Sequence, residues 1–248
     1  MSKRSTRAVL EVAAVGVLLA AASMAWAQEA LVAQLDPSGM VRLMRGDLEL
    51  ATIELSAHGP QWQHAPQTSA TAEVTDLPDG AGKRFVGTLP VPNTNGALQF
   101  TETVKPLPQG LQLEWDISTA EVIKLNGLQV SANLAVAQYG GKELTVERPD
   151  AEPEVVGLPA EKPAQGFQIW TGQGAKIAVA PGTEDALTFE LLAPTDVIVQ
   201  DLRQWEHPIL EVRFPAIMED AGRDVAAEDR FHLALTVTLA APVKLEGP

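Results

Sequence analysis

Two histidines and a tryptophan lie within one short stretch of the sequence, His58-Gly-Pro-Gln-Trp62-Gln-His64. Imidazole nitrogens can bind zinc, and the flat indole of Trp62 can stack on a sugar ring. The spacing matches no recognised metal motif, and no third ligand lies beside the two histidines. A ligand-binding loop therefore competes with a plainer interpretation, in which Trp62 packs on the edge of the fold and the loop binds nothing.

A second set of polar residues alternates with apolar ones between Gly110 and Ile117. Gln112, Glu114 and Asp116 fall on one face of an expected strand, and the strand before it has a polar side of its own. If the two strands pair, their polar groups form a surface that can hydrogen-bond sugar hydroxyls, or whose carboxylates can act on a glycosidic bond. Antiparallel sheets also present a solvated polar face without any function, so both interpretations stay open.

Several chemistries are missing from the sequence. The chain has no cysteine, which excludes disulfides, thiolate metal sites and cysteine nucleophiles. It has no glycine-rich phosphate loop, no G-x-S-x-G turn and no H-E-x-x-H motif. We therefore predict no cofactor and no metal, and assign no catalytic residue.

The elements that must position these residues are strands. Apolar and polar residues alternate over at least five segments, most clearly from Phe231 to Leu239, and this period places one set of side chains on one sheet face. Turn residues separate the segments, as in Arg45-Gly46-Asp47, which predicts a hairpin between strands at 40–45 and 48–55. The apolar stripe changes phase within 48–55, so a β-bulge is expected near Ala51–Thr52. The pattern predicts an all-β fold, a large and mainly antiparallel sandwich.

One segment interrupts this rhythm. Residues 147–166 hold four prolines and five acidic residues, and prolines at that density do not fit a central strand. We expect a loop within a single domain over residues 28–248; a linker between two lobes is the alternative. A further stretch, 219–230, is charged and alanine-rich and predicts either a short helix or a long loop.

The first 27 residues are typical of a secretory signal. Three basic residues precede an apolar run, which ends in Ala25-Trp26-Ala27, a small-x-small cleavage pattern. The uncharged run is shorter than the about 20 residues that a membrane span needs, although a retained anchor remains the alternative. We therefore expect a periplasmic or extracellular protein that is cleaved after Ala27 and has no membrane span after cleavage.

The net charge restricts the partners. The whole chain carries −14, and loss of the signal would leave 15 basic and 31 acidic residues, or −16. A surface of that sign repels phosphate backbones and anionic lipid. Nucleic acid is therefore excluded as a partner, whereas a carbohydrate or an extracellular protein fits.

Three runs of residues resemble a known family. Gly110-Leu-Gln-Leu-Glu-Trp115-Asp-Ile, Leu125-Asn-Gly-Leu-Gln-Val130 and Ala137-Gln-Tyr139-Gly-Gly-Lys142 are similar to the galactose mutarotase-like "supersandwich" domains of carbohydrate-active bacterial proteins. The resemblance implies a supersandwich fold and an association with carbohydrate. It carries over no catalytic residue.

These observations lead to three hypotheses about function. The first is an exported, non-catalytic sandwich that binds carbohydrate or another extracellular partner through His58, Trp62, His64, Gln112, Glu114 and Asp116. The second is a carbohydrate-active enzyme, a glycoside hydrolase or a polysaccharide lyase. The third is a structural envelope protein with no small ligand.

Overall fold

A computed structural model describes residues 31–248, and the predicted secretory signal over 1–27 lies outside these residues. The described chain is built from sixteen strands, one short helix and three 3-10 turns. Among the described residues, no helix is long and apolar enough to cross a membrane. The strands are β1 (Leu31–Leu35), β2 (Val41–Arg45), β3 (Leu48–Gly59), β4 (Gln63–Pro66), β5 (Thr71–Asp76), β6 (Lys83–Pro90), β7 (Ala97–Leu107), β8 (Gly110–Thr119), β9 (Ile123–Ala135), β10 (Glu143–Glu147), β11 (Glu154–Gly157), β12 (Gln168–Val179), β13 (Leu187–Asp201), β14 (Ile209–Val225), β15 (Phe231–Leu239) and β16 (Val243–Glu246). The helical segments are α1 (Val136–Tyr139), η1 (Pro60–Trp62), η2 (Gln67–Ser69) and η3 (Leu202–Trp205).

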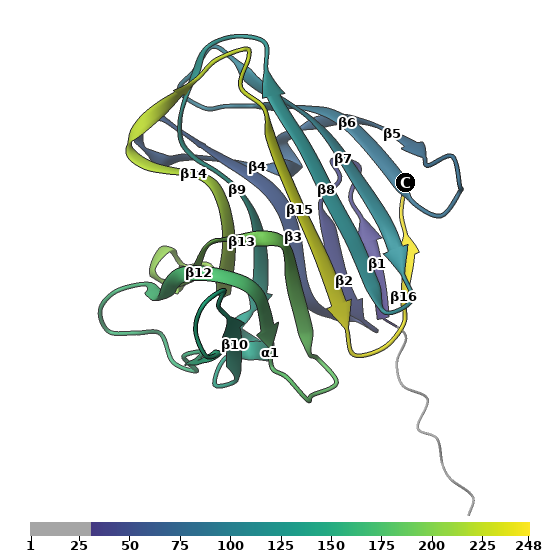
Figure 1. Ribbon diagram of the computed structural model, residues 1–248, viewed down its shortest axis with the longest axis vertical. Coiled ribbons are helices and arrows are strands. Elements are labelled where there is room, and N and C mark those ends of the chain that lie inside the picture. The colour runs from purple at the N-terminus through teal and green to yellow at the C-terminus, as the bar shows by residue number, and fades with distance from the viewer. Residues whose placement is uncertain (1–30) are drawn as a thin grey trace, which may run out of the picture.

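All sixteen strands belong to one curled sheet. Twelve of them follow in the order β16-β1-β2-β3-β9-β14-β13-β15-β8-β7-β6-β5, and β4, β10, β11 and β12 branch from this path. Neighbours pair antiparallel, except for β1 and β16, which are parallel. Figure 1 shows β15, β8 and β7 side by side in one layer, with β3 and β9 behind them. The predicted all-β, mainly antiparallel sandwich is confirmed.

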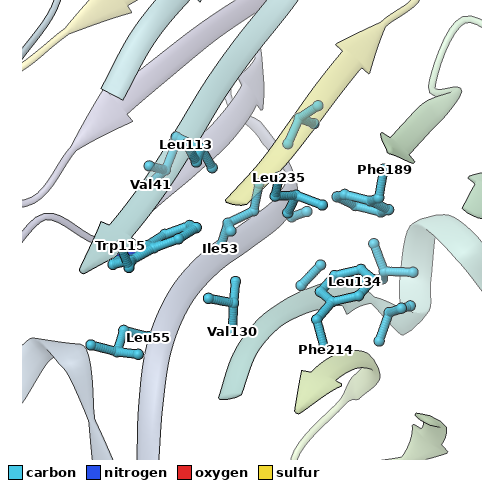
Figure 2. Packing of buried hydrophobic residues seen from close by; sticks show 14 of the residues in the cluster. Val41, Ile53, Leu55, Leu113, Trp115, Val130, Leu134, Phe189, Phe214 and Leu235 are labelled. Atoms are coloured by element: carbon cyan, nitrogen blue, oxygen red, sulfur yellow. The ribbon is translucent and has the colours of Figure 1, made fainter. Parts of the chain in front are cut away.

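The core lies between these two layers. Leu113 and Trp115 of β8 and Leu235 of β15 are buried, and Leu113 and Leu235 are partners in the β8–β15 register. They face Ile53 and Leu55 of β3 across the interior (Figure 2). The period-two stripes therefore mark core-facing positions, as the sequence indicated.

The predicted hairpin and bulge are both present. β2 ends at Arg45 and β3 begins at Leu48, with a turn between them. The β2–β3 register shifts because Leu43 pairs with Ala51 whereas Met44 pairs with Glu49, which leaves Leu50 as the extra residue. The bulge thus lies one residue before the expected position, and it explains the change of phase in the apolar stripe.

Apart from Glu147, which ends β10, residues 147–166 contain one edge strand and no central strand. β11 pairs with β10 alone, as the density of prolines requires. Arg203 of η3 fastens the end of the segment, since its guanidinium donates to the carbonyls of Pro159, Ala160 and Glu161. Asp201 holds that guanidinium at 2.6 Å, so the segment and η3 form one anchored unit.

The short helix or long loop expected over 219–230 is wrong for most of that stretch. β14 continues to Val225 and pairs with β9 through Arg223, Asp224 and Val225. The register shifts between Met218 and Arg223, so the residues between these two bulge out of the pairing. The sequence of this part of the strand shows no apolar stripe, because its side chains are mostly exposed to solvent.

The carboxyl group of Glu102 is fully buried, near the turn between β1 and β2. Glu102 of β7 accepts a hydrogen bond from the Gln67 amide, which also donates to the carbonyl of Ser38 at 2.9 Å. The Gln67 side-chain oxygen accepts from the amide of Leu55 at 2.6 Å. Gly39, at φ +98°, leaves room for the carboxyl, because a Cβ there would collide with it. Burial raises the pKa of Glu102 to about 8, although Gln67 and Trp115 oppose the rise.

Candidate functional site

Four adjacent strands carry a polar face on the side away from the core. In β3 the core residues alternate with polar ones, and the register of β3, β9, β14 and β13 brings the polar positions into rows. Most of these side chains are buried. We call this set the polar face; it consists of Thr52, Glu54, Ser56, His58, Gln129, Ser131, Asn133, Gln200, Glu211 and Arg213.

Glu211 lies at the centre of the polar face. Its Oε1 accepts a hydrogen bond from Ser131 Oγ at 2.7 Å. Its Oε2 accepts from Gln200 Nε2 and from Arg213 Nε, each at 2.7 Å. The carboxylate is thus fixed by three donors from three strands, one of them a cation.

A second carboxyl, that of Glu54, lies on β3, which is separated from the strand of Glu211 by β9. Asn133 Nδ2 donates to Glu54 Oε1 at 3.1 Å and to Thr52 Oγ1 at 3.3 Å. Burial raises the pKa of Glu54 to about 6, Asn133 opposes this, and the charge of Glu211 adds to it. The face therefore holds two carboxyl groups in different environments, one ion-paired and one held by an amide.

The structure brings His58, Trp62 and His64 together at one end of the polar face. His58 and His64 are partners in the β3–β4 register, and their rings stack with centroids 5.1 Å apart. Trp62 meets His58 edge-on at 5.5 Å. Burial, followed by the charge of Arg213, lowers the pKa of His58 to about 3. Burial also lowers the pKa of His64, against the charge of Glu211.

The turn that carries Trp62 has an unusual backbone. Gln61 and Trp62 have φ angles of +64° and +59°, a region that residues other than glycine rarely occupy. Asn93 braces the turn by donating to the carbonyl of Pro60 at 3.3 Å. Two consecutive left-handed residues cost free energy, and such strain concentrates at functional sites. Here the turn directs the indole of Trp62 over β9.

The Trp62 ring lies close against Gly127 of β9. A Cβ on Gly127 would lie 3.0 Å from His58 Nδ1, 3.3 Å from Gln129 Oε1 and 3.3 Å from Trp62 Cζ3. One imidazole nitrogen, one amide oxygen and one aromatic ring therefore converge on a point where the chain has no side chain. Neither polar atom has a hydrogen-bond partner.

Unpartnered buried groups concentrate on the polar face. Of the eight such side-chain atoms within residues 31–248, four belong to it: Ser56 Oγ, His58 Nδ1, Gln129 Oε1 and Asn133 Oδ1. Buried polar atoms normally have partners, because leaving one unpaired costs about 1–3 kcal/mol. Their collection on one face leaves hydrogen-bonding capacity there that the protein's own groups do not use.

The chemistry available here is hydrogen bonding, stacking and proton transfer. The face offers neutral imidazoles, amides, a hydroxyl and two carboxyl groups. Within the described part of the chain, no three His, Asp or Glu side chains are arranged to hold a metal ion. The groups suit a polar, uncharged ligand with many hydroxyls.

The structure does not bring Gln112, Glu114 and Asp116 to this face. They lie on β8, where they alternate with the buried Leu111, Leu113 and Trp115 and therefore point away from the core. Gln112 Nε2 donates to Glu114 Oε1 at 2.7 Å, and Asp116 Oδ1 lies 2.9 Å from Nδ1 of the exposed His232. β8 does pair with β7, as the sequence indicated, and joins Thr101 to Asp116.

A broad hollow of about 930 Å³ covers part of this second surface. Strands β5 to β8 and β15 line it, through Glu73, Thr88, Gln99, Asp116 and His232 among others. Its polar side chains are accessible to solvent or paired with each other, and none of them is among the buried unpartnered atoms. The polar face therefore remains the stronger candidate site.

Comparison with known proteins gives a likeness in structure alone. No protein-family model and no curated protein matches the chain. A putative aldose 1-epimerase from Escherichia coli has a TM-score of 0.55 at 8% identity, over 86% of this chain and 98% of that one. A galactose mutarotase-like protein from Lactobacillus casei has a TM-score of 0.53 at 13% identity, over 84% and 99%. A protein from Synechocystis has a TM-score of 0.53 at 8% identity, over 85% and 91%. The chain has the galactose mutarotase-like fold that the resemblance implied.

Proposed function

We propose that this chain is an exported protein that binds carbohydrate on its polar face. The observation that carries this proposal is the set of four unpartnered buried polar atoms, two of which meet Trp62 at Gly127. An aromatic ring beside fixed polar atoms suits a sugar, whose ring has apolar C–H faces and a rim of hydroxyls. The sugar-related names of two structurally similar proteins add weight to this ligand class.

The polar atoms can satisfy both roles of a sugar hydroxyl. Gln129 Oε1 and Asn133 Oδ1 accept hydrogen bonds, and Ser56 Oγ can donate or accept. His58 is neutral in the fold, so its ring can supply one donor and one acceptor. Each bond to a ligand removes part of the cost of an unpartnered buried group. A ligand without hydroxyls would leave that cost in place.

Trp62→Ala should weaken glycan binding at least tenfold, because it removes the stacking surface and leaves the polar face intact. A glycan array followed by isothermal titration calorimetry of the strongest ligand measures the change. Thermal melting of the variant checks that the fold survives. Asp116→Asn, on the β8 surface, is the matched control and should bind as the wild type does.

Two outcomes would contradict this site. Binding that survives Trp62→Ala would place the ligand elsewhere, and loss of binding in Asp116→Asn would point to the β8 surface instead. Binding of no glycan at all would remove the carbohydrate proposal and favour a structural envelope protein.

The proposal includes export because the first 27 residues have the pattern of a secretory signal, which ends in Ala25-Trp26-Ala27. The mature protein should begin at Gln28 in the periplasm or the medium. Mass spectrometry of the amino-terminal peptide from fractionated cells tests this. A peptide that begins at Met1 or Ser2 in the membrane fraction would show a retained anchor.

Catalysis on a sugar is the second candidate function, and the titratable groups favour it. Glu54, with its pKa raised to about 6, and His58, with its pKa lowered to about 3, share one face with the ion-paired Glu211. Groups whose pKa values are pushed apart within one site suit acid–base catalysis. Such a site could open and close a sugar ring at its anomeric carbon.

Exchange between the α and β anomers of D-galactose, followed by proton NMR, tests this candidate. If the face is catalytic, the protein should accelerate exchange, and Glu54→Gln should reduce the acceleration by about 10²–10⁴-fold, the usual share of one acid–base group. Asp116→Asn serves again as the control. Exchange at the buffer rate would leave binding as the function of the face.

A further inference from the structure

Strand β13 is the place where the curled sheet forks into its two layers. Its residues Leu187–Leu191 pair with β15, which continues into the layer of β8. Its residues Ile198–Asp201 pair with β14, which continues into the layer of β9. Residues 192–197 pair with neither β14 nor β15, so the two layers separate along this part of the strand.

A pocket of about 250 Å³ lies at this fork; we call it the fork pocket. Buried side chains from both layers line it, namely Trp115 of β8, Leu235 of β15, Val130 of β9 and Phe214 of β14. Figure 2 shows these four side chains directed into the interior from their four strands. None of the residues that line the pocket is Asp, Glu, Lys or Arg. A charged group would be buried there without a partner, at a high cost, so the pocket suits an uncharged group.

The rim of the fork pocket is apolar as well. Leu192, Ala193 and Pro194 line the pocket and are exposed, and Leu192, at 76%, is the most exposed of the large hydrophobic residues in the described chain. A bulge holds these residues out of the sheet, because Ala175 of β12 stands opposite the four residues 191–194. Exposed apolar residues beside an apolar pocket extend the surface that a ligand can cover.

A hydrocarbon group fits this pocket better than water does. Thr195 and His232 are the lining residues with polar side chains, whereas an ordered water needs about two to four polar partners. Side chains that face a void lack dispersion contacts on that side, and an apolar ligand restores them. A cavity of about 150 Å³ holds benzene, so by proportion the fork pocket admits roughly ten carbon atoms.

We propose that the fork pocket binds the alkyl chain of an uncharged amphiphile, whose polar end stays in solvent at the rim. A chain suits this shape because buried residues form the inner end of the pocket and exposed residues form its entrance. The site is separate from the polar face. Val130 lines the pocket, whereas its neighbours Gln129 and Ser131 belong to the polar face, so β9 lies between the two sites. The proposal does not depend on carbohydrate binding.

The test varies the length of the chain. The probes are 1-butanol, 1-hexanol, 1-octanol, 1-decanol and 1-dodecanol, titrated by calorimetry. Affinity should rise about fourfold with each methylene that leaves water and should level off near roughly ten carbons, where the pocket is full. The matched ligand is 1,8-octanediol, which must bury a second hydroxyl without a partner and should bind at least about tenfold more weakly than 1-octanol.

Substitutions at the pocket locate the binding. Leu192→Asp places a charge at the exposed rim and should weaken 1-octanol binding about tenfold. Val122→Asp is the matched control, because Val122 is 69% exposed and does not line the pocket, and it should change nothing. Leu233→Trp enlarges a side chain of the pocket wall and should make affinity level off at a shorter chain. Thermal melting checks that each variant folds, and the two exposed positions keep the test decisive if Leu233→Trp does not.

Several results would overturn the inference. They are the absence of alkanol binding, an affinity that does not depend on chain length, equal binding of 1,8-octanediol and 1-octanol, and equal effects of Leu192→Asp and Val122→Asp. Trp62→Ala should leave alkanol binding unchanged, because Trp62 does not line the pocket. Failure of the carbohydrate proposal and failure of this one are therefore read from different ligands and different variants.

Discussion

The free energy of unfolding should fall as the pH rises from about 5 to about 8, and Glu102→Gln should remove most of that fall. Glu102 is fully buried, and its pKa is raised from 4.5 to about 8. The folded state therefore holds a proton that the unfolded chain releases above pH 4.5. Each pH unit in this window costs about 1.4 kcal/mol of stability for one such group.

The sign follows from the direction of the shift. A carboxyl with a raised folded pKa contributes stability that is complete below its unfolded value and is lost as the pH rises through the folded value. Glu54 acts in the same direction, up to a pH of about 6. His58 acts in the opposite direction, because its pKa falls from 6.5 to about 3, and it destabilises the fold as the pH drops through that range. The protein should therefore be most stable at mildly acidic pH.

Urea denaturation at a series of pH values measures this dependence. Glutamine at position 102 stays neutral and can still accept from the Gln67 amide, so Glu102→Gln should flatten the curve between pH 6 and about 8. Glu54→Gln is the control and should flatten the curve only below about pH 6. Wild-type and Glu102→Gln curves that run parallel across the window would show that Glu102 ionises as an ordinary carboxyl.

Glu211→Ala should destabilise the fold by roughly 3 kcal/mol. The substitution leaves the guanidinium of Arg213 without its partner, and removal of one member of a buried ion pair costs about 3–5 kcal/mol. We expect the lower end because the Arg213 side chain keeps 15% exposure. The amide of Gln200 and the hydroxyl of Ser131 also lose their acceptor.

A double-mutant cycle separates the ion pair from the rest of this cost. Glu211→Ala combined with Arg213→Ala should lose less stability than the two single variants add up to, because no unpaired charge remains. Chemical denaturation of the four proteins gives the coupling free energy. Strict additivity would mean that Arg213 finds solvent or another partner when Glu211 is absent.

The strands could be predicted from sequence because each stripe is local. The alternation in β8 and β15 reports which side chains face the core, and glycine- or proline-bearing turns mark where each strand ends. β16 and the end of β14 were missed because one is too short for a stripe and the other is charged. Their positions depend on distant partners, β1 and β9, which no local pattern encodes.

The candidate site could be predicted only in part, for the same reason. His58, Trp62 and His64 attract attention because they are rare residue types in one loop. Glu211 and Ser131 look like ordinary strand residues, and they meet only because the register joins β9 to β14 across some eighty positions of sequence. One sequence signal could have revealed this face: some strands have a fully apolar side and a row of polar residues on the other side. In β9 the residues on both sides are buried, so the polar side is shielded from solvent.

The parallel pairing of β1 with β16 joins the two ends of the described chain, Leu31 to Val243. Closing so long a loop has the highest entropic cost of any step in the sheet, so this contact cannot begin folding and must come late. Until β16 arrives, the outer edge of β1 is open and can pair with another chain. The arrival of β16 covers this edge and leaves a strand of only four residues at the border of the sheet, and so short an edge offers little to another chain.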